Sequence, residues 1–355
     1  MESGPASLTL SDIRRQPAVW QSSVARAREF FPTFQRMTRE ADEVIFMGAG
    51  CSHAVAQYAQ ASFQQHAGRP CRVATSMDFF QFPKWVASVQ ARSLFVVFTR
   101  SGETTETLEA QRYARKLGAK IICVTSTEDA PIPSEAHEVL SLPDSLEEAM
   151  LPTISTSSMM AAMQMLSFQM AEEEEVKLLL MDRIHRMLED RLESQIEVGR
   201  RAGENAEIRR AVFLGSGPIQ GAAHAGSLMW QMATALPAAA YPVMEFRHGP
   251  METCGPDLLL AAVLSYGGRR EEVALTREMR LRGPKLMANM TDAIPGTENF
   301  EYPDALGEHV TDYARGSLAL PLFQSLAVHK ALALGRDPDE LGTHPPIVTI
   351  DLRQY

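Results

Sequence analysis

Positive charge is scarce in this sequence of 355 residues. The Lys and Arg side chains number 34 against 44 Asp and Glu, which gives a formal net charge of −10. Such a chain is poorly suited to bulk binding of nucleic acid or of an anionic membrane, because both select basic surfaces. A small phosphorylated metabolite is not excluded, since that ligand needs only a local positive field.

Patterns for metal binding and for membrane crossing are also missing. The four cysteines lie far apart, with no CxxC pair and no His at a spacing suited to zinc. No apolar run reaches the length of a membrane span, and the opening residues MESGPASLTLSDIRRQ contain no apolar h-region of a signal peptide. We therefore expect no metal, reduced thiols and a cytoplasmic location.

What is present is an alternation of short apolar runs with segments of helical periodicity. The content of 45% apolar and 22% charged residues suits a globular protein, and the length suits about two domains. Strands are predicted at residues 43–47, 72–74, 95–98 and 120–124, with helices between most of them. This order is typical of a parallel sheet covered by helices on both faces.

The pattern then restarts in the second half of the chain. The residues AVFLGSG at 211–217 are similar to IFMGAG at 45–50, and an acid follows the first glycine of each copy by thirty residues, Asp78 and Glu245. We interpret this as an internal duplication that gives two doubly wound, flavodoxin-like α/β domains. The predicted boundaries are an N-terminal helical segment at 1–28, domains at 29–170 and 205–340, a connecting helix at 171–204 and a tail at 341–355.

The most informative stretch is LFVVFTRSGETTET at residues 94–107, where an apolar run ends in a cluster of five hydroxyl side chains. A helix is predicted from Leu108 onward, so Thr99 to Thr104 form a strand-to-helix turn. Free N–H groups at a helix start attract anions, and small hydroxyls add neutral donors around them. The turn therefore favours a phosphate cradle. The alternative is a capping box in which Ser101 and Thr104, with Glu103 nearby, only cap the helix.

A nicotinamide cofactor is not favoured. The segment Gly48-Ala49-Gly50 lacks the third glycine of a dinucleotide fingerprint and is not followed by an acid about twenty residues on. A Walker-type loop is absent as well. The glycines more simply allow a sharp turn that presents Ser52 at a helix start, and we expect no cofactor.

A second group of titratable residues lies in MEFRHGP at 244–250. Glu245 and His248 there suit proton transfer between adjacent carbons, which uses a carboxylate base and an imidazole that serves a ring oxygen. The alternative is an ion pair of Arg247 with a capping Glu245. The hydroxyl run at 153–158 fits helix capping and ligand contact equally well.

Taken together, these motifs resemble the two-domain form of the sugar isomerase (SIS) family. GAGCS, TRSGETTET, STSS and EFRHGP occur in that order along nearly the whole chain. The family includes the isomerase half of glutamine–fructose-6-phosphate amidotransferase, ketosamine deglycases, and tagatose-type isomerases and deaminases. The resemblance implies a sugar-phosphate substrate, binding residues at the four motifs, and a homodimer in which the ring-opening His248 is donated across the interface. The implied binding residues are Gly50, Ser52, Thr99, Arg100, Ser101, Gly102, Thr104 and Ser155.

Two positions depart from the family pattern. The amidotransferase isomerase has a catalytic Glu sixteen residues before the turn His, and that position is Met232 here. The same enzymes carry a Lys in the tail that forms an imine, whereas no Lys follows Lys330 in this sequence. Retention of Glu245-Phe246-Arg247-His248 nevertheless favours the enzyme that the resemblance implies, an isomerase or deaminase of hexose or hexosamine 6-phosphates with Glu245 as base, His248 for ring opening and His344 of the tail, whereas Met232 and the missing Lys favour the alternative. The alternative is a catalytically silent sensor that binds a phosphosugar.

Overall fold

The computed structural model describes residues 4–88, 92–171, 174–266, 268–290, 297, 300–305, 310–340 and 347–350. The chain forms two compact units, each built around one sheet. The first-sheet unit comprises Gln16–Leu146, Ile154–His185 and Thr343–Tyr355. The second-sheet unit comprises Met1–Arg15, Glu147–Thr153 and Arg186–Gly342. The long helices α1, Ser7–Glu40, and α8, Glu174–Gly203, each contribute to both units.

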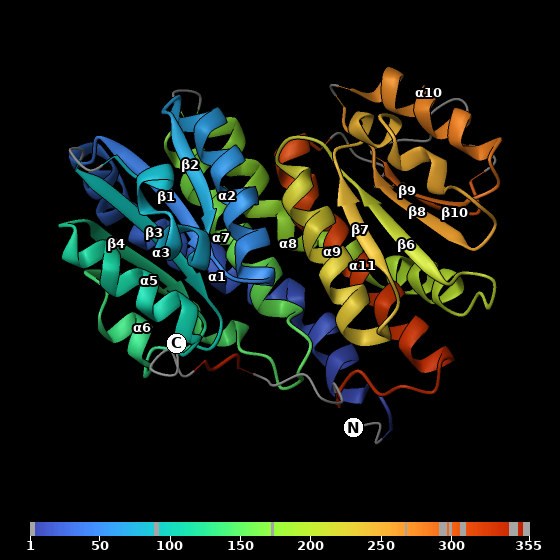
Figure 1. Ribbon diagram of the computed structural model, residues 1–355, viewed down its shortest axis with the longest axis horizontal. Coiled ribbons are helices and arrows are strands. Elements are labelled where there is room, and N and C mark those ends of the chain that lie inside the picture. The colour runs from blue at the N-terminus through green and yellow to red at the C-terminus, as the bar shows by residue number, and fades with distance from the viewer. Residues whose placement is uncertain are drawn as a thin grey trace. The chain divides into compact units, whose positions relative to one another are not determined.

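The first sheet contains five parallel strands in the order β2-β1-β3-β4-β5. Figure 1 shows this sheet in blue and teal, with β1 and β3 beside each other. The strands are β1 Glu43–Gly48, β2 Cys71–Thr75, β3 Ser93–Thr99, β4 Lys120–Thr125 and β5 Glu138–Ser141. The helices are α2 Cys51–Ala67, α3 Ser76–Gln81, α4 Pro83–Val86, α5 Thr105–Lys116, α6 Pro131–Ser134 and α7 Ile154–Gln169, with a 3-10 turn η1 at Pro143–Ser145.

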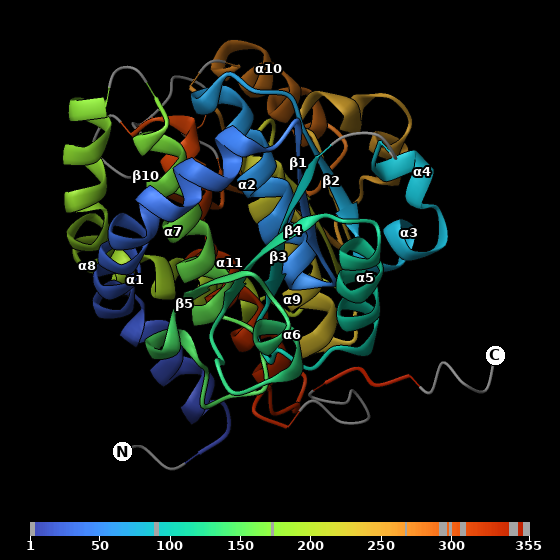
Figure 2. The same cartoon turned by 90° about the vertical axis from the view of Figure 1, so that its left-hand side faces the viewer.

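Apolar residues alternate between the two faces of the first sheet. Phe95 packs with Phe79 of α3 on one face, where α5 also lies, while Phe46 packs with Phe63 of α2 on the other. Figure 2 shows α3 and α5 on one side of the sheet and α2 and α7 on the opposite side. Because both faces are covered, every residue of β3 is buried, as its uninterrupted apolar run predicts.

The second sheet repeats the topology, with the parallel order β10-β9-β8-β6-β7. Its strands are β6 Arg210–Leu214, β7 Ala238–Tyr241, β8 Leu258–Val263, β9 Lys285–Met290 and β10 Tyr302–Ala305. Its helices are α9 Ile219–Thr234, α10 Arg269–Arg280 and α11 Asp312–Ala333, with 3-10 turns η2 at Met244–Arg247 and η3 at Pro250–Thr253.

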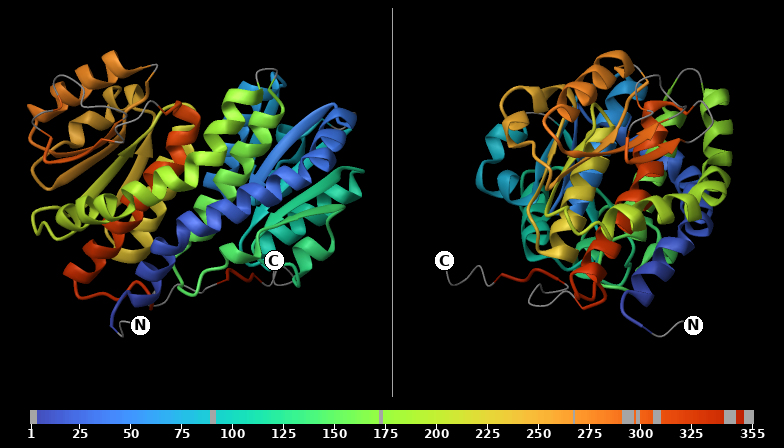
Figure 3. Two further views of the ribbon diagram at one scale, coloured as in Figure 1. Left: turned by 180° about the vertical axis from the view of Figure 1, so that it is seen from behind. Right: turned by 90° about the vertical axis from the view of Figure 1, so that its right-hand side faces the viewer.

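The two faces of the second sheet are covered by different helices. Met279 of α10 packs in a buried cluster with Leu260 of β8. On the opposite face, Phe213 of β6 meets Phe323 of α11 edge-on at 5.0 Å between ring centroids. Figure 3 shows α11 in red along one side of this sheet and α10 in orange on the other. The repeated strand order confirms the predicted α/β fold with two doubly wound sheets. No helix within the described residues is both long and apolar enough to span a bilayer.

The turn from β1 into α2 depends on a close backbone approach at Gly48. A Cβ atom at this position would lie 2.6 Å from the backbone carbon of Ser52, which is closer than such atoms come in real structures. We predict that Gly48→Ala lowers the free energy of unfolding by about 1–3 kcal/mol, because the start of α2 must move away from the sheet. Urea denaturation measures the change.

Gly4→Ala is the matched control, since a Cβ there meets nothing within 4 Å. Equal stability of the two variants would show that the β1–α2 turn is not tightly constrained.

Candidate functional site

The strand order of the first sheet brings two distant loops to one place. The chain leaves β1 for β2 on one side and later returns to form β3 on the other side of β1. Crevices at such reversals, beyond the carboxyl ends of the strands, are the usual ligand sites of open α/β sheets. Here the two loops are residues 49–52 after β1 and residues 100–104 after β3.

The loop after β1 presents the start of helix α2. Gly50 has a φ of 55°, a left-handed conformation that favours glycine, and α2 begins at the next residue. The backbone N–H of Ser52 donates to the Ala49 carbonyl at 3.0 Å, which closes the turn. Ser52 is half-buried in the first turn of α2, and its hydroxyl therefore lies where helix N–H groups are not all paired within the helix.

The loop after β3 is fixed by hydrogen bonds within the loop and to neighbouring residues of the same unit. Gly102 donates its N–H to the Thr99 hydroxyl at 3.0 Å and accepts from the Ile132 N–H at 2.9 Å. The Thr127 hydroxyl donates to the carbonyl of Arg100 at 3.1 Å. Gly102 has a φ of 71°, and a Cβ there would lie 2.5 Å from the Cβ of Ala130, so this position requires glycine. Thr99 is only 3% exposed, which makes its hydroxyl part of the loop framework.

The start of α5 lies at the end of this loop. Thr104 is the N-cap residue and makes no side-chain capping hydrogen bond, so the capping box considered from the sequence does not form. The Ser101 hydroxyl accepts from the Glu103 N–H at 3.3 Å, a weak contact that leaves room for another partner. Ser101 and Thr104 are both half-buried. Their hydroxyls thus surround the N–H groups of a helix start.

The C-terminal tail also contacts the start of α5, which the sequence did not predict. The Thr105 N–H donates to the Val348 carbonyl at 3.3 Å, and the Thr105 hydroxyl accepts from the Ile350 N–H at 3.2 Å. These partners are separated by more than 240 residues in the sequence. No local pattern announces such a contact. One N–H of the helix start is therefore already paired with the tail.

Ser155 lies in the first turn of α7, and the packing of α7 shows where that turn is. Gln164 of α7 accepts from Tyr58 of α2 at 2.8 Å, and Phe168 meets the His66 ring at 4.7 Å. In these two pairs the later residue of α7 contacts the later residue of α2, so the two helices run in the same direction. Ser155, 2% exposed, is therefore at the same end of the unit as Gly50 and Ser52.

The predicted group at residues 244–250 lies in a turn of the second-sheet unit. Some residues of this turn are fixed by packing or pairing, and others are exposed. Phe246 is fully buried and packs near the Tyr241 ring, while Arg247 pairs with Glu278 of α10 at 2.8 Å. Glu245 and His248 are exposed, and the His248 N–H donates to the Glu245 carbonyl at 3.0 Å. The alternative ion pair between Arg247 and Glu245 is not formed. The turn is fixed by Phe246 and Arg247, which leaves the two titratable side chains accessible.

The remaining positions singled out in the sequence differ in what they offer. Met232 is half-exposed on α9. Lys330 is 2% exposed, and its ammonium donates to the Asn205 carbonyl at 2.7 Å. Burial lowers the pKa of Lys330 from its usual value, yet no path for a sugar to this buried amine is evident from its contacts. His344 lies outside the described residues. Within those residues, no group of three or more His, Cys, Asp or Glu could hold a metal ion.

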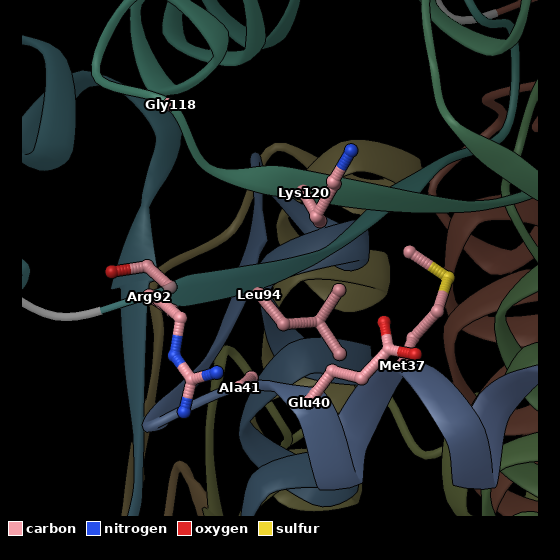
Figure 4. Close-up of a pocket in the computed structure, with 8 residues that line it drawn as sticks. Met37, Glu40, Ala41, Arg92, Leu94, Gly118 and Lys120 are labelled. Carbon is pink, nitrogen blue, oxygen red and sulfur yellow. The ribbon is translucent and has the colours of Figure 1, made fainter.

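A cavity of about 310 Å³ opens at the other end of the first sheet. Its lining, in Figure 4, includes Leu94 and Lys120 at the starts of β3 and β4 and Met37 near the end of α1. Arg92 at its rim pairs with Asp42 at 2.8 Å. The amino ends of the strands lack both the helix starts and the hydroxyl loops, so we assign the site to the carboxyl ends.

Known proteins are similar to this chain in both sequence and fold. Residues 37–168 match the SIS domain. Glutamine–fructose-6-phosphate aminotransferase (isomerizing) of Thermus thermophilus is 26% identical over 357 residues, covering 96% of this chain and 58% of the relative. The chain thus spans a little over half the length of the curated relatives that it matches.

Two solved structures share the fold over nearly the whole chain. The tagatose-6-phosphate ketose/aldose isomerase of Escherichia coli has a TM-score of 0.84 at 21% identity, covering 97% of this chain and 99% of that one. The glucosamine-6-phosphate deaminase of Thermotoga maritima has a TM-score of 0.78 at 22% identity, covering 97% and 100%. The matched segment contains both loops at the strand reversal of the first sheet, and the fold of these neighbours extends over both sheets. Residues 37–168 are therefore similar to the SIS domain, and the two solved structures share the fold of nearly the whole chain.

Proposed function

We propose that the first-sheet unit binds the phosphate group of a phosphosugar. The observation that carries this proposal is the meeting of the two loops at the ends of β1 and β3. Ser52, Ser101 and Thr104 offer hydroxyl donors there, at the starts of α2 and α5, where the positive ends of the two helix dipoles favour an anion. Arg100 brings a positive charge to an otherwise acidic chain. Gly50 and Gly102 permit the backbone turns, and Ser155 is proposed to contact the sugar.

We further propose that the chain interconverts or deaminates hexose or hexosamine 6-phosphates. In this proposal His248 protonates the ring oxygen and recovers a proton from the anomeric hydroxyl, so that the ring opens to the free aldehyde. Glu245 then removes the C2 proton while O1 gains one, and returns it to C1 while O2 loses one, which gives the ketose and regenerates the carboxylate. With an amino group at C2, the same shift gives an imine that water hydrolyses to the ketose and ammonia. Support comes from the exposure of both side chains on an anchored turn and from the names of the relatives, which act on fructose 6-phosphate, tagatose 6-phosphate and glucosamine 6-phosphate.

The exposure of Glu245 and His248 also supports a homodimer. A catalytic pair works best where water is excluded, and neither side chain is covered within its own unit. We propose that a second copy of the chain completes the site, with His248 donated across the interface. His344 of the tail is proposed to close over the sugar, next to the tail residues that contact α5.

The second candidate function is binding without turnover, as a phosphosugar sensor. Met232 and the buried Lys330 favour it, because neither supplies the base or the accessible amine that the family's amidotransferase branch uses. A thermal-shift screen with hexose, hexosamine and ketosamine phosphates, followed by product analysis, separates the two functions. Binding with product supports the enzyme, and binding without product supports the sensor.

We predict that Ser101→Ala and Thr104→Val each weaken phosphosugar binding by about 1–3 kcal/mol. Each substitution leaves charged phosphate oxygens without a hydrogen-bond donor. Isothermal titration with glucose 6-phosphate and glucosamine 6-phosphate measures the effect. Ser22→Ala, whose hydroxyl donates to the Val19 carbonyl within α1, is the matched control. If glucose binds as tightly as its 6-phosphate, there is no phosphate cradle.

We predict that no imine forms on this chain during turnover. The Lys330 amine is buried against the Asn205 carbonyl and is not presented to an open-chain sugar. Borohydride treatment in the presence of fructose 6-phosphate should leave the intact mass unchanged. A trapped adduct, located by peptide mapping on Lys330 or another Lys, would establish covalent catalysis instead.

We predict that Glu245→Gln reduces isomerisation or deamination by roughly 10²–10⁴-fold, because it removes the general base. Affinity for the phosphosugar should stay within a few-fold, since the cradle belongs to the other unit. Solvent deuterium should enter C1 or C2 with the wild type and not with the variant, as NMR can detect.

Glu252→Gln, a nearby exposed acid in η3 paired with Arg282, is the control and should retain activity. An active Glu245→Gln variant would place the base elsewhere. A wild type that binds phosphosugars but exchanges no deuterium with any of them would exclude the enzyme and leave the sensor.

A further inference from the structure

The strand reversal of the second sheet contains a buried carboxylate. Glu272, in the first turns of α10, is 2% exposed, and its Oε2 accepts from the Ser265 N–H at 2.6 Å. Ser265 follows β8, and Ser216 follows β6, the two strands at which this sheet reverses its order. Burial raises the pKa of Glu272 and the nearby Asp312 carboxylate raises it further, while hydrogen bonds from the backbone and hydroxyl of Ser265 and the hydroxyl of Ser216 oppose that rise.

The loop around this carboxylate is built like the loop after β3. The Gly268 N–H donates to the Ser265 hydroxyl at 2.8 Å, as the Gly102 N–H donates to the Thr99 hydroxyl at 3.0 Å. A Cβ on Gly268 would lie 3.0 Å from the Glu272 Oε1, so the loop closes tightly onto the carboxylate. The Glu272 carboxylate is thus held at the start of α10 by N–H and hydroxyl groups of the loop after β8.

The loop hydrogen bonds identify the corresponding residue of the first sheet. Ser265 corresponds to Thr99 and Gly268 to Gly102, so the residue four positions after each glycine is Glu272 in the second copy and Glu106 in the first. Both acids lie in the first turn of a helix, α10 and α5. Glu272 is 2% exposed and accepts from its loop, whereas Glu106 is only half-buried. The two copies therefore differ in whether this carboxylate is enclosed by the loop.

A buried cation offsets the charge. Arg315 of α11 has no exposed side-chain surface and bonds Asp312 at 3.1 Å. Burial lowers the pKa of Arg315, and the carboxylates of Asp312, Glu272 and Asp304 counteract this effect. Glu272 therefore has a backbone donor from its own loop and lies near the Arg315 cation, while the Asp312 carboxylate acts against a charge on it.

The same carboxylate connects to the turn with the proposed catalytic pair. The Ser216 hydroxyl accepts from the Val243 N–H at 3.2 Å, so its own proton is available for Glu272. Val243 immediately precedes the turn Met244–Arg247. The Arg247 ion pair with Glu278 attaches that turn to α10, the helix that carries Glu272.

We propose that Glu272 is a positioning residue: its carboxylate occupies, in the second-sheet unit, the place that a phosphate group takes in the first, and it holds the turn of Glu245 and His248. This inference rests on the proposed function. It implies one phosphosugar site per chain, with the second site permanently filled by the protein itself.

The test replaces the internal anion by an added one. Glu272→Ala and the control Glu271→Ala, an exposed neighbour on α10, are made in a Ser101→Ala background that weakens the first cradle. Thermal unfolding is followed with sodium formate, inorganic phosphate or sodium chloride at equal ionic strength. Formate or phosphate should raise the midpoint of the Glu272→Ala protein by about 2–4 °C more than that of the control. An identical response of both proteins overturns the inference.

Activity with Ser101 intact supplies the second readout. Glu272→Ala should lower kcat by roughly tenfold or more with KM within a few-fold, and formate should restore kcat. Loss of kcat without any anion rescue indicates general damage and overturns the positioning role. The unfolding assay needs no turnover, so it tests Glu272 even if the proposed reaction is wrong.

The wild type gives a measurement that does not depend on how the variant folds. Titration with glucosamine 6-phosphate, or whichever phosphosugar binds, should give one site per chain, and Ser101→Ala should weaken it. Two sites per chain overturn the inference. If Glu272→Ala does not fold, Ser216→Ala replaces it in the kinetic assay. Ser216→Ala should lower kcat, and formate should not restore it because the Glu272 carboxylate is still in place. An unchanged kcat contradicts the link from Glu272 through Ser216 to Val243.

Discussion

The parallel pairing of β1 with β3 is the constraint on which the candidate site depends. It places the ends of two strands side by side although the loops that follow them are about fifty residues apart in the sequence. Each loop alone is an ordinary strand-to-helix turn. Together they bring hydroxyls from two loops and two helix starts to the same end of the sheet, an arrangement that suits the phosphate group proposed to bind there. The burial of every β3 residue makes this pairing costly to disturb.

The fold was predictable because its signals are local. Uninterrupted apolar runs ending in glycine or hydroxyls gave the parallel strands, and the repeat of GAG as GSG gave the second sheet. The strand-to-helix turn after β3, in which the proposed cradle lies, was predictable for the same reason. The role of each individual hydroxyl was not predictable from the sequence. Thr99 closes its own loop, while Ser101 and Thr104 remain at the helix start, and only the path of the backbone separates these roles.

Contacts between residues far apart in the chain could not be predicted from the sequence. Thr105 bonds the tail at Val348 and Ile350, and Arg247 bonds Glu278 on another helix. Nothing in the composition of either segment specifies such a partner. Glu272 was equally hidden, because within RREEVALTREMR it looks like any acid in the first turn of a helix. Its burial depends on the packing of α10 against the sheet, which a single sequence does not encode locally.

The two copies of the fold show how a binding site and a scaffold can arise from one pattern. A helix start beside hydroxyl loops attracts negative charge in both sheets, and the copies differ in where that charge comes from. In the second sheet we propose that the negative charge is the carboxylate of Glu272, a side chain of the protein itself, which bonds the loop after β8 without any ligand. In the first, the corresponding acid Glu106 is only half-buried, and we propose that the hydroxyls of Ser101 and Thr104 receive an anion from outside. A permanently ordered second copy suits a turn whose Glu245 and His248 must be presented in a fixed geometry, whereas an open first copy suits a substrate that must enter and leave.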